Sequence, residues 1–194
     1  MKWSNAIRKL EELAHAAADL AASPAAQFSL PVTQLWAAGP VLGPPGDLEW
    51  VDVAVVVDLP VAEVPWLTKP FGSEHWENTT RAAKQPITRL WRSAHAPVWN
   101  HHIDRPALFW DRETGLDEDV LAALREGRAE DVRIPAPTPE EFRARMAEDV
   151  AVSLAAVRER TRAYESQRWA RGGFTAAADE LWEATSGYVD LVDA

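Results

Sequence analysis

The stretch LWAAGPVLGPPGDLEWVDVAVVVDLP, residues 35–60, consists of two apolar runs joined by a turn rich in glycine and proline. In the second run, valines at every other position from Val51 to Val57 face one side of a predicted strand, while Asp52 and Ala54 face the other. The pattern predicts a β-hairpin formed by residues 32–42 and 49–59, with a loop longer than two residues.

Helical patterns lie on both sides of this hairpin. Residues 4–22 carry apolar side chains at helical spacing and stop before a proline, which predicts an amphipathic N-terminal helix. Ser73 is placed to cap a second helix that runs to about Lys84, because Pro86 ends any helix there. Between that proline and residue 111 the sequence predicts one or two strands, the clearest of them at residues 106–111.

The last third of the chain is predicted to be helical. Asp117 caps a short helix, and Thr138 with Glu141 forms a capping box that starts a helix of about 25 residues ending near Trp169. Another helix is expected from about Thr175. The apolar stripes of the two long helices are Phe142, Met146, Val150, Leu154, Val157, Thr161 and Tyr164 in the first, and Leu181, Trp182, Thr185, Tyr188, Val189 and Val192 in the second.

These elements predict an α+β fold. We expect a small mixed or antiparallel sheet that starts with the hairpin, with the N-terminal helix and two long antiparallel C-terminal helices packed on it. Residues 1–134 would form an α/β core, and residues 138–194 a helical hairpin packed on that core within a single compact unit.

Composition limits the classes of function. The chain has 194 residues, 47% of them hydrophobic, and no cysteine, which excludes disulfides and thiolate metal sites. Neither an export signal nor an apolar stretch of the roughly 20 residues needed to span a membrane is visible, so we expect a soluble cytoplasmic protein without membrane partners. The net charge of −10 disfavours nonspecific nucleic-acid binding. Most of the ten tryptophans should fill the core, and exposed ones would anchor an interface.

The order of the first elements resembles the polymerase-beta-type nucleotidyltransferases, including the minimal ones paired with small helical toxin proteins. In that family a helix precedes a strand that ends in Gly-Ser, and the next strand carries Asp-x-Asp. The corresponding residues here are Gly39-Pro40 and Asp52-Val53-Ala54. Proline in place of the serine removes an N–H and a hydroxyl from the phosphate site, and alanine in place of the second aspartate removes a Mg²⁺ ligand.

The resemblance leaves two interpretations. An active enzyme would need Mg²⁺ with a nucleotide, and would use Asp52, Asp111 and a third group as catalytic residues, because Asp58 would lie roughly 20 Å from Asp52 along the strand. The favoured interpretation is a noncatalytic relative that binds a protein partner, a small ligand or a second copy of itself. Its candidate ligand-binding residues are Gly39, Trp99, Asn100, His101 and Asp104.

A histidine cluster offers a further alternative, a metal-binding enzyme built on residues 95–104. His95 and His102 are weak candidate metal ligands, since imidazoles with a carboxylate suit Zn²⁺, Ni²⁺ or Fe²⁺. The spacing matches no HExxH pattern, and adjacent His101 and His102 would point to opposite faces of a strand.

Three segments, LEWVDVAVVVDLP, WRSAHAPVWNHHIDRP and LWEATSGYVDLVDA, resemble a family of uncharacterised actinobacterial proteins of about this length. That resemblance spans the whole chain and implies no known activity.

Overall fold

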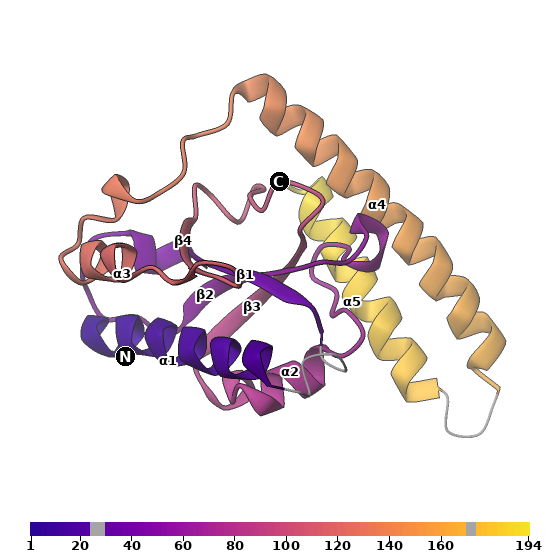
Figure 1. Ribbon diagram of the computed structural model, residues 1–194. Helices are drawn as coiled ribbons and strands as arrows, with labels where there is room; N and C mark the ends of the chain where they lie inside the picture. Colours follow the sequence, from indigo (N-terminus) through magenta and orange to yellow (C-terminus); the bar gives the residue numbers. More distant parts are fainter. Residues whose placement is uncertain (24–29, 170–173) are drawn as a thin grey trace.

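The computed structural model describes residues 1–23, 30–169 and 174–194, and within them it contains a five-stranded mixed sheet (Figure 1). The strands lie in the order β3-β2-β1-β4-β5, where β2 and β3 are parallel and the other neighbours antiparallel. Their bounds are Val32–Ala38 for β1, Val51–Val57 for β2, Ile87–Ser93 for β3, Ala107–Asp111 for β4 and Gly115–Leu116 for β5. The predicted α+β class is confirmed.

The predicted hairpin is formed by β1 and β2, whose register pairs Val32 with Val57 and Ala38 with Asp52. The first strand ends at Ala38, four residues earlier than predicted. Gly39 adopts a left-handed φ of 64° and begins a 3-10 turn that runs to Leu42. Every residue of β2 is buried, because both faces of the sheet are covered.

Five helices occur in the described residues: α1 Trp3–Ala22, α2 Ser73–Thr79, α3 Glu118–Arg125, α4 Pro139–Gln167 and α5 Phe174–Val192. The caps predicted for α3 and α4 are present, since Asp117 accepts from Val120 and the Thr138–Glu141 capping box is complete. Helix α2 is shorter than predicted. Gly72 rather than Ser73 precedes it, and Arg81, at φ 60°, separates it from a 3-10 turn at Ala82–Lys84.

Two apolar clusters cover the two faces of the sheet. The larger one joins α1 and α3 to the side of β2 that carries Val53, Val55 and Val57. The smaller one joins Ala54, on the opposite side of β2, to the connection between β3 and β4 and to Leu191 of α5. Helices α4 and α5 lie side by side (Figure 1), and they contact this second cluster through Leu191, Met146 and Val150.

The inner faces of α4 and α5 differ from the predicted apolar stripes. In α4 the buried residues include Arg145, Asp149 and Ser153, while the stripe from Phe142 to Tyr164 is only half-buried. Among residues 175–192 of α5 the buried ones are Ala177, Ala184, Gly187 and Leu191. The predicted stripe of α5 instead contains exposed residues: Trp182 is 72% exposed, Val189 49% and Val192 54%.

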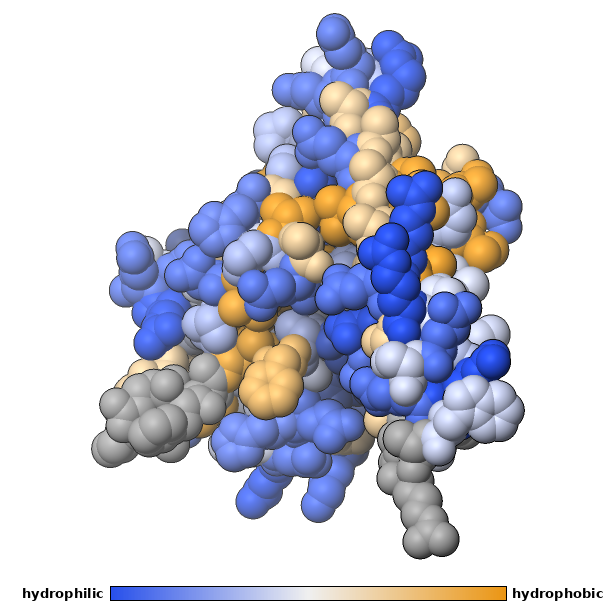
Figure 2. All heavy atoms as spheres, turned by 90° about the vertical axis from the view of Figure 1, so that its right-hand side faces the viewer, coloured by the Kyte–Doolittle hydropathy of each residue, from blue (hydrophilic) through white to orange (hydrophobic). Residues whose placement is uncertain are grey.

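Gly187 explains why α5 buries its small residues. A Cβ atom at this position would lie only 1.9 Å from the carbonyl oxygen of Trp66. Helix α5 can therefore pack this closely against the backbone of residues 66–67 only because residue 187 has no side chain. This contact turns Trp182 and Val189 away from the core. Figure 2, which faces the side of the molecule formed by α4 and α5, shows hydrophobic residues at the surface among hydrophilic ones.

We expect Gly187→Ala to destabilise the protein by about 1–3 kcal/mol, the usual range for overpacking, although alanine is the better helix former. Denaturant titration monitored by circular dichroism measures the change, with Ser186→Ala on the same helix as the control. A variant at least as stable as the parent would show that α5 does not depend on this close approach.

Candidate functional site

The segment that faces α5 is held by a buried tryptophan. Trp66 is 1% exposed, and its indole N–H donates to a carboxylate oxygen of Asp190 on α5 at 2.6 Å. The next residue, Leu67, has a left-handed φ of 56°, an uncommon conformation for a branched side chain, and it is 40% exposed. The local backbone therefore places an apolar side chain at the surface directly beside α5.

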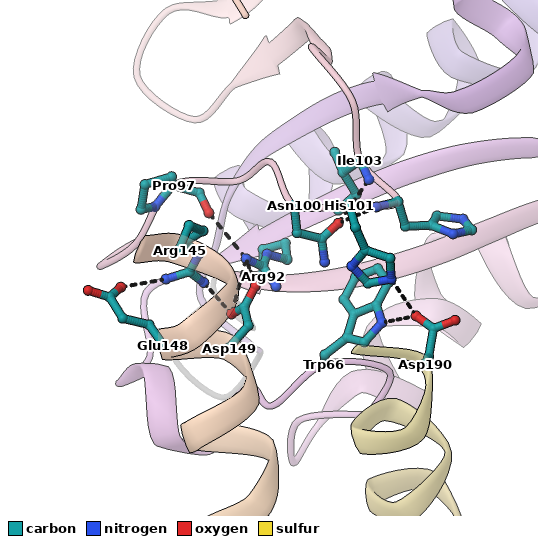
Figure 3. A network of polar contacts seen from close by, with 11 residues as sticks. Trp66, Arg92, Pro97, Asn100, His101, Ile103, Arg145, Glu148, Asp149 and Asp190 are labelled. Carbon is teal, nitrogen blue, oxygen red and sulfur yellow. Dashed lines mark hydrogen bonds and ion pairs between the residues drawn. The ribbon is translucent and has the colours of Figure 1, made fainter. Parts of the chain in front are cut away.

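Asp190 joins three segments that are far apart in the sequence (Figure 3). The same carboxylate oxygen that accepts from Trp66 lies 2.7 Å from Nε2 of His101. Burial raises the pKa of Asp190, but the hydrogen bonds from Trp66 and His101 outweigh it, so the pKa lies below its ordinary value. Asp190 is therefore ionised at neutral pH and fixes the orientation of both rings.

Asn100 shapes the turn that presents His101. Its side-chain oxygen accepts from the backbone N–H groups of His102 at 2.9 Å and Ile103 at 2.8 Å. This Asx-type turn holds the imidazole of His101 toward α5.

A buried ion cluster attaches α4 to the same region (Figure 3). Asp149 accepts from Arg92 of β3 at 3.1 Å and from Arg145 of its own helix at 2.6 Å. The guanidinium of Arg92 also lies 5.7 Å from the ring centre of Trp66. Burial lowers the pKa of Arg92, and the charge of Asp149 partly restores it. The cluster therefore links α4, β3 and Trp66.

A groove opens between this framework and the outer surface of α5. We call it the α5 groove; its volume is about 710 Å³, within the range of ligand sites. Apolar and carboxylate side chains both contribute to it. The lining residues are Leu67, His101, Trp182, Thr185, Ser186, Val189, Asp190, Asp193 and Ala194.

A second hollow, of about 720 Å³, adjoins the α5 groove and shares Trp182 with it. It lies between residues 69–75 and the first half of α5, and Phe71 at its edge is fully exposed. Together the two hollows are lined by six carboxylates and one lysine, Lys69. The carboxylates are Glu74, Asp179, Glu180, Glu183, Asp190 and Asp193.

Asp52 lies near the start of β2, buried against Gly39. A Cβ atom on Gly39 would be 2.3 Å from the Asp52 carboxylate, so glycine is required for this contact. Burial raises the pKa of Asp52, and hydrogen bonds involving Thr88 and Trp50 only partly counter it. The structure therefore brings together two of the residues that the nucleotidyltransferase resemblance implied.

Asp111 does not join them. It pairs with Gln34 near the start of β1, whereas Asp52 pairs with Ala38 at its end. Four residues along the strand correspond to about 13 Å, and β1 itself lies between the two aspartates. The structure does not bring Asp52 and Asp111 within reach of one shared ion.

The other predicted ligand-binding residues are dispersed. Trp99 stacks on Phe142 of α4 with ring centres 6.3 Å apart. Asp104 forms an ion pair of 2.9 Å with an arginine in the segment between α3 and α4. Asn100 is used in its own turn. Of the five predicted residues, only His101 lines one of the two hollows.

Within the described residues, neither of the two candidate metal ligands belongs to a cluster of metal-binding side chains. His95 pairs with Asp58 at 3.0 Å, both side chains being more than half exposed, and His102 has its ring centre 5.8 Å from that of Trp66. In residues 1–23, 30–169 and 174–194 no group of three or more histidine, aspartate or glutamate side chains is arranged to hold a metal ion.

Sequence reasoning missed most of the groove. Leu67 lies between the two prolines of VPWLTKPF and Phe71 follows the second, in a stretch without strand or helix periodicity. Asp190 interrupts the apolar run YVDLV. An acidic residue within an apolar helical stripe was the one available signal for a site there.

Fold and site thus define an α+β protein with a mixed sheet and an acidic groove beside its last helix. The chain belongs to the family described as "Domain of unknown function (DUF7711)", whose model matches residues 1–194. Neither the curated proteins nor the solved structures include a match. None of the described helices has the length and apolar character required to cross a membrane.

Asp52→Asn is expected to raise the melting temperature at pH 7 by a few degrees. The native pKa of Asp52 lies above the unfolded value, so its ionised form opposes folding at neutral pH. This gain should disappear as the pH falls through the raised pKa to below the ordinary value of 3.8, where the carboxyl is protonated in both states.

Thermal melts of both proteins between about pH 3 and pH 8 would measure the difference. Asp47→Asn, an exposed loop variant, controls for the loss of one charge. A loss of stability at pH 7 in Asp52→Asn would mean that the hydrogen bonds of the carboxylate outweigh its burial.

Proposed function

We propose that this protein acts without catalysis, as a binding protein whose binding surface is the α5 groove with its adjoining hollow. The observation that carries the proposal is the exposure of Leu67, Phe71, Trp182 and Val189 around two neighbouring hollows. Exposed apolar residues gathered in this way mark interaction sites on soluble proteins, and tryptophan is frequent among the residues that dominate binding energy.

The surface is supported by a rigid framework. Trp66, His101 and Asp190 are fixed by mutual hydrogen bonds, and the ion cluster around Asp149 holds α4 behind them. A preformed surface loses little conformational entropy when a partner binds, which favours affinity.

The proposal also places the chain as a noncatalytic relative of the nucleotidyltransferases. The contact between Gly39 and Asp52 supports the relationship. Pro40, Ala54 and the distance along β1 between Asp52 and Asp111 argue against retained catalysis, because a two-carboxylate Mg²⁺ site needs ligands on one face within a few ångströms.

Nucleotides provide the test of catalysis. We expect no change in melting temperature with any nucleoside triphosphate in the presence of Mg²⁺, in either the parent protein or Asp52→Ala. A Mg²⁺-dependent rise that Asp52→Ala abolishes would support the active enzyme instead, and transfer assays would follow.

Nile red, a neutral apolar dye that fluoresces in apolar surroundings, provides the test of the groove. The native protein should enhance its fluorescence, and Trp182→Ser should weaken binding about tenfold, the loss typical of an aromatic anchor. Trp169→Ser is the matched control, since Trp169 is 84% exposed but lines neither hollow. Equal binding by all three proteins would place the apolar site elsewhere and contradict the proposal.

A further inference from the structure

From the charge and shape of this surface we infer that its partner is a basic amphipathic helix of another protein. The inference rests on the proposed function and specifies its partner. The α5 groove and the adjoining hollow would receive the apolar side of that helix, and the carboxylates around them would pair with its lysines or arginines.

The first argument is the distribution of charge. Six carboxylates line the two hollows, and Arg160 of α4 neutralises one of them, Glu180, through an ion pair of 2.6 Å. Asp190 is already bonded to Trp66 and His101. Four carboxylates therefore face a single lysine, Lys69. Charge complementarity favours cationic partners and raises their rate of association, while it repels anionic ones.

The same charge argues against three other occupants. Nucleic acid and anionic membrane surfaces would bring phosphates against the carboxylates. A second copy of this chain, seated symmetrically on the same surface, would bring the carboxylates of one copy against those of the other. A protein segment with positive charge avoids these costs.

The second argument is the pattern of apolar residues. Trp182 and Val189 are seven residues apart on α5, which places them on the same side of the helix two turns apart. Leu67 lines the same groove, and Phe71 extends the apolar surface along the adjoining hollow. An apolar strip of this kind matches the i, i+3, i+4, i+7 face of a docked helix.

The third argument is length. The two hollows share Trp182 and run along α5 from Ala176 to Asp193, which corresponds to about 26 Å at the rise of an α-helix. A partner helix of about 17 residues has the same length. A small cation would fill only part of this surface and would leave most of its apolar residues in water.

The experiment uses a fluorescent peptide of about 18 residues that places leucines at i, i+3, i+4 and i+7 with lysines on both flanks. A second peptide has glutamates in place of the lysines, and a third has the same composition in an order that removes the amphipathic face. Fluorescence anisotropy with the full chain should show binding of the first peptide alone, with an affinity that falls as salt rises.

Two groups of variants separate apolar from charged contributions. Trp182→Ser should weaken binding of the lysine peptide about tenfold, and so should the combination Asp179→Asn, Glu183→Gln and Asp193→Asn. The matched control, in which Asp47→Asn, Glu49→Gln and Glu113→Gln neutralise three exposed carboxylates outside both hollows, should change affinity about twofold or less.

Several results would overturn the inference. Equal binding of the lysine and glutamate peptides, or equal binding of the reordered lysine peptide, would show that the surface does not select a basic amphipathic helix. A stable dimer that Trp182→Ser dissociates would make a second copy the occupant, and binding to anionic vesicles that Trp182→Ser abolishes would make it a membrane. None of these results would by itself contradict the proposed function, because the neutral dye tests the apolar groove independently of the partner.

Discussion

The approach of α5 to the backbone at Trp66 determines which surface of the molecule is left open. Gly187 permits a carbonyl oxygen to lie where a Cβ atom would otherwise be, and the buried side of the helix consists mainly of small residues. Because one side of α5 is committed to this contact, Trp182 and Val189 must face outward. The exposed apolar surface is thus a geometric consequence of the close packing behind it.

A polar cluster stabilises the neighbouring helix in one arrangement. Asp149 is shared by Arg92 and Arg145, and all three side chains are buried. Removal of the carboxylate would leave Arg92 without a charged partner and Arg145 with only the longer ion pair to Glu148, at a cost of about 3–5 kcal/mol. An apolar contact tolerates sliding, whereas this cluster requires α4 to keep one register against β3. That register supports Trp66, which in turn orients Asp190 at the groove.

The elements that sequence reasoning predicted are those encoded by local patterns. The alternation in β2, the amphipathic stripe of α1 and the capping box at Thr138 each act within a few residues, so they were recognisable without knowledge of the tertiary structure. The side of α5 that faces the core is not the one with its apolar stripe, because it depends on a contact between Gly187 and Trp66, which are far apart in the chain. Of the candidate ligand residues, only His101 lines the groove. Its position also depends on a residue far away in the chain, because its imidazole contacts Asp190.

The packing on the Ala54 face of the sheet also determines the position of the groove. In the nucleotidyltransferases that the first elements resemble in order, a metal ion is held on the sheet face that corresponds to Asp52 and Ala54. Here Ala54 is fully buried in an apolar cluster with Val98, Ile103 and Leu191, so side chains fill the space above it. Leu191 belongs to α5, and its insertion there fixes the end of the helix whose other side forms the groove. The same contact that covers the sheet at Ala54 therefore supports the outer surface to which we assign binding.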